Sequence, residues 1–142
     1  MTDTFMPRFH LAFPVDDLLK ARAFYAGVLG CREGRSGDTW VDFDLYGHQI
    51  VAHLAPAPRR IETWSQVDDD DIPVPHFGTI LSLNDWQTLA DRLRAAGVRF
   101  IREPGIRFRG EKGEQWTLFL LDPSGNALEF KAFSSIDRIF AR

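Results

Sequence analysis

The sequence contains a single cysteine, no excess of basic residues and no long apolar run. Cys31 is the only cysteine among 142 residues, so no intrachain disulfide can form and a reducing, cytoplasmic setting is favoured. The 17 basic and 20 acidic residues give a net charge of −3, which disfavours nucleic acid as a partner. No stretch of the sequence is long and apolar enough to span a bilayer. Residues 1–7 lack the basic-then-apolar pattern of a signal peptide. We therefore expect a cytoplasmic protein that binds neither nucleic acid nor a membrane.

The composition that remains is that of an ordinary globular domain. Hydrophobic residues make up 44% of the chain and charged residues 26%, which is neither a disordered nor a membrane composition. Twelve Phe and four Trp supply bulky apolar surface for a core or a lined cavity. A chain of this length fits one domain.

The first half of the chain reads as a strand, a helix and three further strands. Large apolar residues at every second position over residues 9–13 predict a strand that stops at Pro14. Apolar residues at helical spacing over residues 18–28 predict a helix that Asp16 or Asp17 caps. The remaining strands of this half are predicted over residues 31–35, 39–45 and 49–54.

The second half repeats this order after an irregular segment. Residues 56–74 are rich in proline and contain the run Asp68 to Asp71, which is typical of a linker or surface loop. A strand over residues 76–83 and a helix capped by Asn84 follow. The last predicted elements are strands over residues 98–102, 115–121 and 127–133, a loop over residues 104–113 and the turn at residues 122–126.

Two landmarks show that the halves are related by pattern. His10 and His76 open corresponding strands 66 positions apart, and Gly30 and Gly97 end corresponding helices 67 positions apart. A repeat of pattern at one offset indicates two copies of one supersecondary unit. We predict an α+β fold in which two βαβββ modules form a curved mixed sheet around a metal-binding cavity. The modules span about residues 8–55 and 75–133, with a linker at 56–74 and a tail at 134–142.

Four ionisable side chains are expected on the sheet face that the helices leave uncovered. Successive side chains of a strand point to opposite sides. The apolar set of the first strand, which begins at Phe9, should pack on the helices. Four side chains then take the other face: His10, His53, His76 and Glu129. An ionised glutamate on such an apolar strand needs a partner, and a metal ion is one that also organises the histidines.

The chemistry of this set favours a divalent metal. Two imidazoles and one carboxylate form the facial triad of non-haem Fe(II) oxygenases, so Fe(II) is favoured, while Mn, Ni, Co and Zn also suit these ligands. Two neutral histidines and one carboxylate leave a formal charge of +1 on the site. This charge favours an anionic substrate with two adjacent oxygens that can chelate the metal.

The chain resembles the vicinal oxygen chelate superfamily, which includes glyoxalase I, extradiol dioxygenases, and bleomycin and fosfomycin resistance proteins. The marks are the two strand-opening histidines, the segment FYAGVLG over residues 24–30 and the segment DPSGNALEF over residues 122–130. The resemblance covers essentially the whole chain. It implies paired βαβββ units, metal ligands at His10, His76 and Glu129, and frequent homodimers.

The resemblance also suggests roles for residues around the metal. Extradiol dioxygenases carry a histidine acid/base near the metal, and His53 is the candidate here, with a fourth ligand and a hydrogen-bonded cavity residue as the alternatives. From their position in the Gly-rich loop and not from the resemblance, Arg107 and Arg109 are candidates to clamp a substrate carboxylate, with plain solvent exposure as the alternative. Trp116 and Phe119 take the place near the substrate where this family often has a tyrosine.

Three functions are compatible with this pattern. The first is an extradiol-type ring-cleaving dioxygenase that chelates a catechol-like dianion. The second is a glyoxalase-like lyase or isomerase, although the chain has His53 where glyoxalase I places a carboxylate ligand. The third is a resistance protein that sequesters a small molecule without catalysis.

Overall fold

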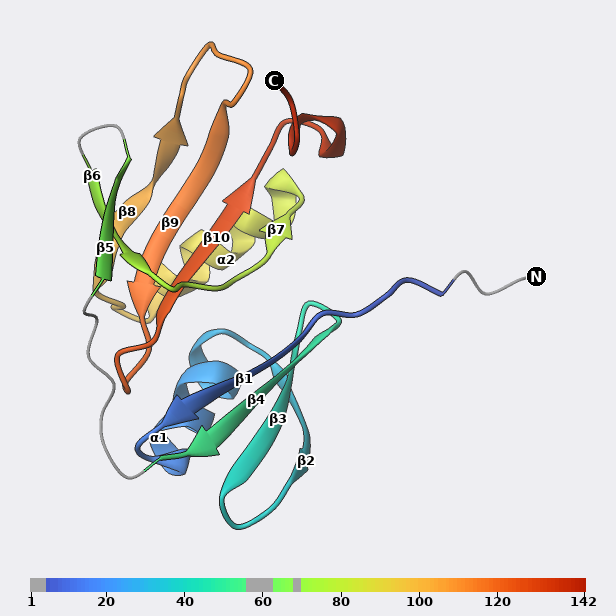
Figure 1. Cartoon of the computed structure of the whole chain (residues 1–142), viewed down its shortest axis with the longest axis vertical. Helices are drawn as coiled ribbons and strands as arrows, with labels where there is room; N and C mark the ends of the chain where they lie inside the picture. The colour runs from blue at the N-terminus through green and yellow to red at the C-terminus, as the bar shows by residue number, and fades with distance from the viewer. Residues whose placement is uncertain (1–4, 56–62, 68–69) are drawn as a thin grey trace. The chain divides into compact units, whose positions relative to one another are not determined.

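The computed structural model describes residues 5–55, 63–67 and 70–142. The chain divides into two compact units, Met1–Pro58 and Arg59–Arg142. Each unit contains one four-stranded mixed sheet and one main helical segment (Figure 1). The expected α+β fold is therefore confirmed.

The first unit has the predicted βαβββ order. Its first strand is parallel to its last, and the sheet order is β1-β4-β3-β2. A register irregularity lies between β2 and β3. Its elements are β1 (His10–Val15), α1 (Leu18–Arg22), which continues as η1 (Ala23–Val28), β2 (Arg32–Ser36), β3 (Trp40–Leu45) and β4 (His48–Leu54).

The core of the first unit lies between the helical segment and one sheet face. Tyr25 is fully buried, and its ring centroid lies 5.2 Å from those of both Phe13 and Phe43. Asp17 is the helix cap, since its Oδ1 accepts a hydrogen bond of 3.0 Å from the Lys20 N–H. The chain leaves the helix through Gly30, whose φ of 79° suits glycine.

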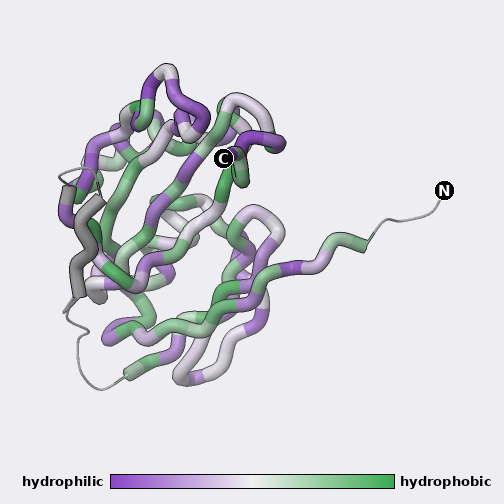
Figure 2. The backbone as a smooth tube through the Cα atoms, turned by 45° about the horizontal axis from the view of Figure 1, so that its top comes forward, coloured by the Kyte–Doolittle hydropathy of each residue, from purple (hydrophilic) through white to green (hydrophobic). Residues whose placement is uncertain are grey.

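Phe9 corrects the prediction for the first strand. This side chain was expected to pack on the helices but is 63% exposed. The strand begins only at His10, so Phe9 lies in the N-terminal arm together with Phe5 and Met6. Figure 2 shows the hydrophobic part of this arm in green.

The second unit repeats the same sheet order. The order is β7-β10-β9-β8, again with the first strand parallel to the last. Its elements are β5 (Thr63–Val67), β6 (Asp70–Val74), β7 (Ile80–Leu81), α2 (Leu83–Ala95), β8 (Phe100–Arg107), β9 (Gln115–Leu121), β10 (Ala127–Ala132) and η2 (Ile136–Arg138).

A hairpin stands where the sequence predicted a linker. Strands β5 and β6 pair antiparallel, with Thr63 opposite Val74. Residues 56–62 and the pair Asp68 and Asp69 lie outside the described residues. Prolines are tolerated in a strand that has only one paired edge, which explains why Pro73 fits into β6.

The segment before α2 follows β10 closely but forms little regular strand. Only Ile80 and Leu81 are assigned to β7, although a strand over residues 76–83 was predicted. Backbone hydrogen bonds nevertheless begin at Phe77, whose carbonyl accepts from the Glu129 N–H at 2.9 Å. The Lys131 N–H donates to the Thr79 carbonyl at 3.2 Å. This pairing fixes the segment against the middle of β10.

Helix α2 covers one face of the second sheet (Figure 1). Its cap is Ser82 rather than the predicted Asn84, because the Ser82 hydroxyl accepts a hydrogen bond of 3.1 Å from the Asp85 N–H. The buried Trp86 donates from its indole nitrogen to the Phe130 carbonyl at 3.0 Å. No helix among the described residues is long and apolar enough to cross a membrane.

Strand β8 extends further than predicted. The sequence placed a loop over residues 104–113, but β8 continues to Arg107. Register irregularities between Phe100 and Gly105 accommodate Pro104 at the edge of the sheet.

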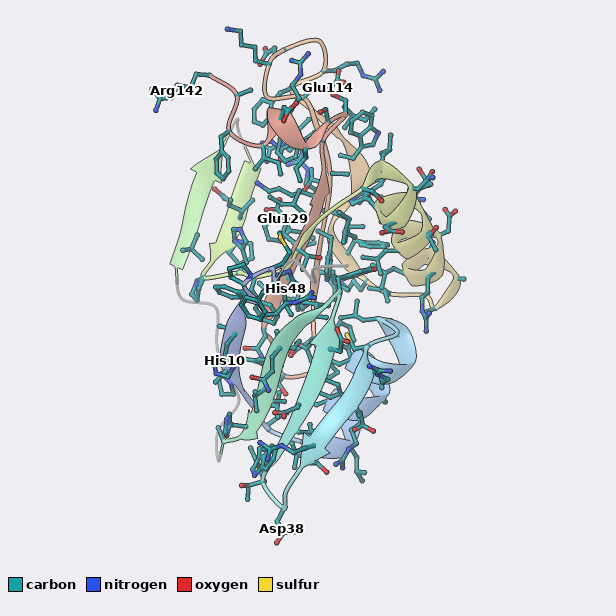
Figure 3. All side chains as sticks on the ribbon, turned by 90° about the vertical axis from the view of Figure 1, so that its right-hand side faces the viewer. His10, Asp38, His48, Glu114, Glu129 and Arg142 are labelled. Carbon is teal, nitrogen blue, oxygen red and sulfur yellow. The ribbon has the colours of Figure 1, made fainter. Side chains whose placement is uncertain are left out.

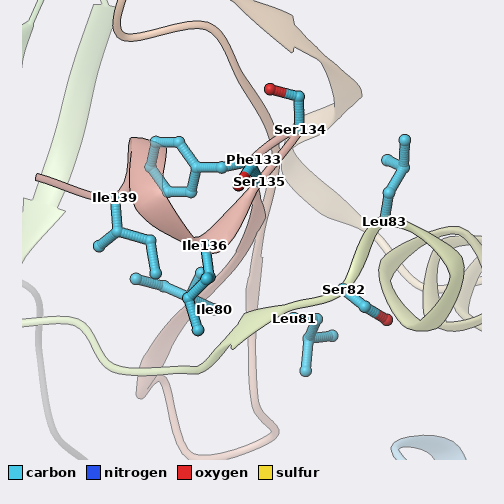
Figure 4. A pocket seen from close by; sticks show the side chains of 9 residues that line it. All are labelled: Ile80, Leu81, Ser82, Leu83, Phe133, Ser134, Ser135, Ile136 and Ile139. Carbon is cyan, nitrogen blue, oxygen red and sulfur yellow. The ribbon is translucent and has the colours of Figure 1, made fainter. Parts of the chain in front are cut away.

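The tail after β10 folds back toward β7 and lines one side of an open pocket of about 290 Å³. Figure 4 shows Ile136 and Ile139 of the tail beside Ile80. Phe140 is 90% exposed. The lining of this pocket contains only aliphatic, aromatic and serine side chains, so it cannot supply the ligands of a metal.

Candidate metal site

Glu129 lies in the middle of β10 (Figure 3), on the sheet face opposite α2. It pairs with Phe119 of β9, and the next residue on its face, Lys131, pairs with Thr117. Leu128 and Phe130 point the other way and are fully buried. The alternation of apolar and polar residues in this strand therefore directs one carboxylate away from the helix-covered core, as predicted.

Three side chains contact the Glu129 carboxylate. The Thr117 hydroxyl donates to Oε2 at 2.7 Å. His76 Nε2 lies 3.4 Å from Oε1, and Lys131 Nζ lies 3.7 Å from the same oxygen. Only 9% of the Glu129 side chain is exposed, and such a buried charge needs this set of partners.

His76 is held from two sides. Its Nδ1 lies 2.7 Å from the Pro73 carbonyl oxygen, which can only accept a hydrogen bond. Its ring meets the Phe119 ring edge to face, with 4.8 Å between the centroids. Nδ1 therefore carries the proton, and Nε2 is directed to Glu129.

The contact between these two groups shifts both pKa values. The hydrogen bond to Glu129 raises the pKa of His76 above its ordinary 6.5, against the lowering effect of burial. Burial acts to raise the pKa of Glu129, but the hydrogen bonds with His76 and Thr117 hold this pKa below its ordinary 4.5. The charged forms of both residues are thus favoured together in the metal-free protein.

The stability of the metal-free protein should depend on pH through this pair. The raised His76 pKa contributes stability that is complete below pH 6.5 and is lost as the pH rises through the folded-state value. The lowered Glu129 pKa contributes stability that is present above pH 4.5 and is lost as the pH falls through the folded-state value. Replacing His76 with alanine should therefore cost about 1–2 kcal/mol more near pH 5.5 than near pH 8.5.

Urea unfolding in the presence of a chelator measures this difference. The packing that the ring loses is the same at every pH, so only the pH-dependent part reports the ion pair. An equal cost of the substitution at both pH values would contradict the assignment.

His10 of the first unit has a matching arrangement with different partners. It is exposed at the start of β1 (Figure 3), opposite Gln49 of β4. Its Nδ1 lies 2.8 Å from Gln49 Oε1, so this nitrogen also carries the proton. His48 differs, because its Nδ1 accepts from the Phe9 N–H at 2.9 Å. The two predicted ligands thus share one tautomer, and a histidine that was not predicted as a ligand has the other.

This donor set fits a divalent metal. A histidine ligand typically donates from its second nitrogen to a carbonyl or carboxylate, which leaves the other nitrogen for the metal. In both His10 and His76, Nδ1 faces the acceptor and Nε2 is left for the metal. Glu129 offers a carboxylate beside His76. Within each unit, the described residues contain no group of three His, Cys, Asp or Glu that could hold a metal by itself. The convergence of His10 with the other two stays a prediction.

The remaining predicted site residues do not all lie on the sheet faces that carry the proposed ligands. His53 lies on the same sheet face as His10, and its ring is exposed. Phe119 and Arg107 share the face of Glu129, since β8 pairs Arg107 with Gln115. Trp116 pairs with Ala132 and so points to the helix-covered face. Arg109 is exposed beyond the end of β8, and the structure does not bring it to Glu129.

Thr117 and Gln49 are among the contributing residues that were not predicted from the sequence. Thr117 donates to Glu129, and Gln49 accepts from His10. Strand alternation places Thr117 on the face of Phe119, which is a signal that the sequence contains. The partner of each residue depends on strand register, which alternation alone does not provide.

Comparisons with known proteins show the family to which the chain belongs. The family model described as the glyoxalase/bleomycin resistance protein/dioxygenase superfamily matches residues 9–130. A glyoxalase/bleomycin resistance protein/dioxygenase from Alicyclobacillus acidocaldarius is 31% identical, with a TM-score of 0.78 over 94% of this chain and 96% of that one.

Two further relatives have more specific names. The metallothiol transferase FosB of Lysinibacillus sphaericus (strain C3-41) is 25% identical over 130 residues, which is 92% of this chain and 84% of that protein. The fosfomycin resistance protein FosX of Listeria monocytogenes is 16% identical, with a TM-score of 0.68 over 95% and 98% of the two chains. The latter shows likeness of fold alone. On the family match and the shared fold, the chain belongs to the glyoxalase/bleomycin resistance protein/dioxygenase superfamily.

Proposed function

We propose that this protein is a divalent-metal-dependent enzyme that acts on a small anionic molecule through two neighbouring oxygens. The favoured reaction is the addition of a nucleophile such as a thiol to that molecule. His10, His76 and Glu129 would hold the metal. The single observation that carries the proposal is that Nδ1 of each histidine faces an oxygen acceptor, with His76 Nε2 beside the Glu129 carboxylate.

A bound divalent ion would supply Lewis acidity to the chelated oxygens. The chain's own residues prepare the site for it. Thr117 and Lys131 hold the Glu129 carboxylate in its ionised form, and the Pro73 carbonyl holds the His76 proton on Nδ1. The two atoms that would become ligands, His76 Nε2 and Glu129 Oε1, lie 3.4 Å apart.

Charge on the Glu129 face supports an anionic substrate. Lys131 is 35% exposed in its side chain and lies two residues beyond Glu129 on the same face. Arg107 enters the same face from β8 and is 8% exposed. These cations suit a phosphonate or carboxylate group, since charge-assisted hydrogen bonds to such groups are the strong ones.

The likeness to a metallothiol transferase favours nucleophile transfer over ring cleavage. That relative is 25% identical along 92% of this chain. Because members of one fold support different reactions, the reaction needs a direct test.

The test is to load the metal-free protein with Mn(II), Zn(II) or Fe(II) and supply fosfomycin, a small phosphonate epoxide, with cysteine as the thiol. We expect metal-dependent loss of the thiol and a new phosphorus resonance for the adduct. Tight binding of fosfomycin by metal-free protein, without turnover, would instead indicate sequestration. Absence of both binding and turnover with a panel of anionic epoxides would count against this reaction.

Extradiol ring cleavage is the second candidate, and His53 is the observation that favours it. This histidine shares a sheet face with His10, and its ring has no hydrogen-bond partner among the described residues, so it is available to move a proton. Anaerobic loading with Fe(II), followed by catechols and oxygen, tests this candidate. Oxygen uptake that is lost in His53→Ala would support it. The expected homodimer stays a prediction.

Replacing Lys131 with methionine should separate substrate binding from metal binding. The methionine retains most of the stem but removes the charge near Glu129 Oε1. We expect affinity for the metal to stay equal or to rise a few-fold, and affinity of the metal-loaded protein for a phosphonate to fall about tenfold. Calorimetric titration measures both.

Lys112→Met is the matched control, because Lys112 is an exposed lysine of the same unit in the turn after β8. Equal phosphonate affinity in Lys131→Met and the control would remove Lys131 from the binding site.

A further inference from the structure

A chain of hydrogen bonds leads from the interior of the first unit to His10. Gln49 Oε1 lies 2.8 Å from His10 Nδ1, and Gln49 Nε2 donates to Asp42 Oδ2 at 3.4 Å. The three residues come from three adjacent strands, β1, β4 and β3, and all lie on the face away from the helix. His10 is exposed at the outer end, whereas Asp42 is only 8% exposed.

The inner end of this chain is buried and closely packed against β2. A side chain on Gly34 would put its Cβ 3.2 Å from the Asp42 Cβ, so the glycine in β2 leaves room for the aspartate. A carboxylate oxygen accepts hydrogen bonds and an amide nitrogen only donates them. Asp42 therefore turns the nitrogen of the Gln49 amide toward itself and the oxygen toward His10.

The outer end determines where His10 carries its proton. An amide oxygen can only accept, so the proton lies on Nδ1 and the lone pair lies on Nε2. The Nδ1–H form is the less common tautomer of a free imidazole in water, so an exposed histidine needs an acceptor to hold it. In the second unit a backbone carbonyl, that of Pro73, does this for His76. In the first unit the acceptor is the side chain of Gln49, which can be replaced by mutation.

We propose that Gln49 and Asp42 are positioning residues that hold His10 in its Nδ1–H tautomer and so present Nε2 as a metal ligand. The use of that nitrogen for a metal rests on the proposed function, whereas the tautomer itself does not. Outer residues that orient a histidine ligand typically contribute about 10–100-fold to metal affinity.

The tautomer can be measured directly in the metal-free protein. Two-bond ¹H–¹⁵N correlation spectra at a pH where the imidazoles are neutral distinguish the two forms for each of the four histidines. We expect the Nδ1–H pattern for His10 and His76. His48 should show the Nε2–H pattern in the same spectrum, because its Nδ1 accepts from Phe9, and it serves as the internal reference.

Gln49→Leu removes the acceptor at an exposed position, where the fold should tolerate it. His10 should then shift toward the Nε2–H form while His48 and His76 keep their patterns. Metal affinity should fall about 10–100-fold. Asp38→Leu is the control, because it also replaces an exposed polar side chain of the same unit with leucine, between β2 and β3 and away from β1.

A double variant that exchanges the acid and the amide of Asp42 and Gln49 should rescue the His10 tautomer. Gln49→Glu keeps an acceptor for His10, and Asp42→Asn in the same protein supplies a donor for the new carboxylate. This double variant should restore the Nδ1–H pattern and most of the metal affinity. Asp42→Asn alone permits the Gln49 amide to flip and exchange its oxygen and nitrogen. The spectrum of this single variant should therefore show a mixture of tautomers for His10.

The two readouts separate the two proposals. An unchanged His10 tautomer in Gln49→Leu, or an Nε2–H pattern for His10 in the unmodified protein, would overturn the positioning role. Failure of the unmodified protein to bind any divalent metal, with the tautomers as expected, would overturn the metal function and leave the hydrogen-bond chain supported.

Discussion

Replacing Gly78 with alanine should destabilise the second unit by about 3 kcal/mol or more and lower its midpoint of thermal unfolding by roughly 10 °C. A Cβ at this position would lie 1.7 Å from the carbonyl oxygen of Glu129 and 2.7 Å from its carbonyl carbon. Both contacts are with backbone, so no side-chain rotation can relieve them.

The neighbouring hydrogen bonds prevent the segment from moving away. Phe77 and Thr79, on either side of Gly78, are bonded to β10 through the Glu129 and Lys131 N–H groups. The methyl group must therefore break this pairing or displace Glu129 itself. In the second case the carboxylate would also lose its contacts with Thr117 and His76.

Thermal unfolding followed by circular dichroism measures this effect. Gly105→Ala is the control in the same unit, because a Cβ there meets only the Glu103 carbonyl oxygen at an ordinary 3.8 Å. Metal affinity of the folded fraction gives a second readout, which should fall in Gly78→Ala and not in the control. Equal unfolding midpoints for Gly78→Ala and the unmodified protein would refute the close approach of the two segments.

Loss of His76 should reduce divalent-metal affinity at least about 100-fold, more than the loss of an orienting neighbour would. In the proposed site the ring provides one of three ligands, through the nitrogen that now faces Glu129 at 3.4 Å. Metal content of purified His76→Ala, together with calorimetric titration, should show this loss beside the unmodified protein.

Two further variants make the result specific. His48→Ala removes a histidine whose Nδ1 accepts from a backbone N–H, and it should keep its metal. Glu129→Gln keeps the size of the side chain and an oxygen for the Thr117 hydroxyl but removes the charge, so it should fold and yet bind metal weakly. Equal metal content in His76→Ala and the unmodified protein would exclude His76 as a ligand.

The local sequence pattern was sufficient to predict the structure of a segment wherever that structure depends on the segment's own residues. The predicted strand over residues 115–121 coincides with β9, because a run of apolar residues is bounded there by turn residues. The predicted strand over residues 39–45 contains β3, in which the alternating residues Val41, Phe43 and Leu45 are all buried. Asp17 was one of two expected caps and is the one used. These features depend on alternation and capping, which act over a few residues.

Features that depend on pairing between distant segments were not predicted. The sequence suggested both Trp116 and Phe119 for the site, but the register of β9 with β10 places only Phe119 beside Glu129. Strand alternation alone shows that residues three apart point to opposite faces. Which of the two faces holds the glutamate is a matter of register, and a shift of one residue would reverse it.

The sequence by itself determined the fold family, the repeated βαβββ pattern and the identity of the candidate ligands, because periodicity and the motif around Asp122 to Phe130 are local. Only the tertiary structure decided what surrounds those ligands. Thr117 and Lys131 reach Glu129, and Gln49 reaches His10, across strand pairs whose members lie far apart in the chain. Hydrogen-bond partners of this kind are set by strand register and close backbone approach, which no short stretch of residues encodes.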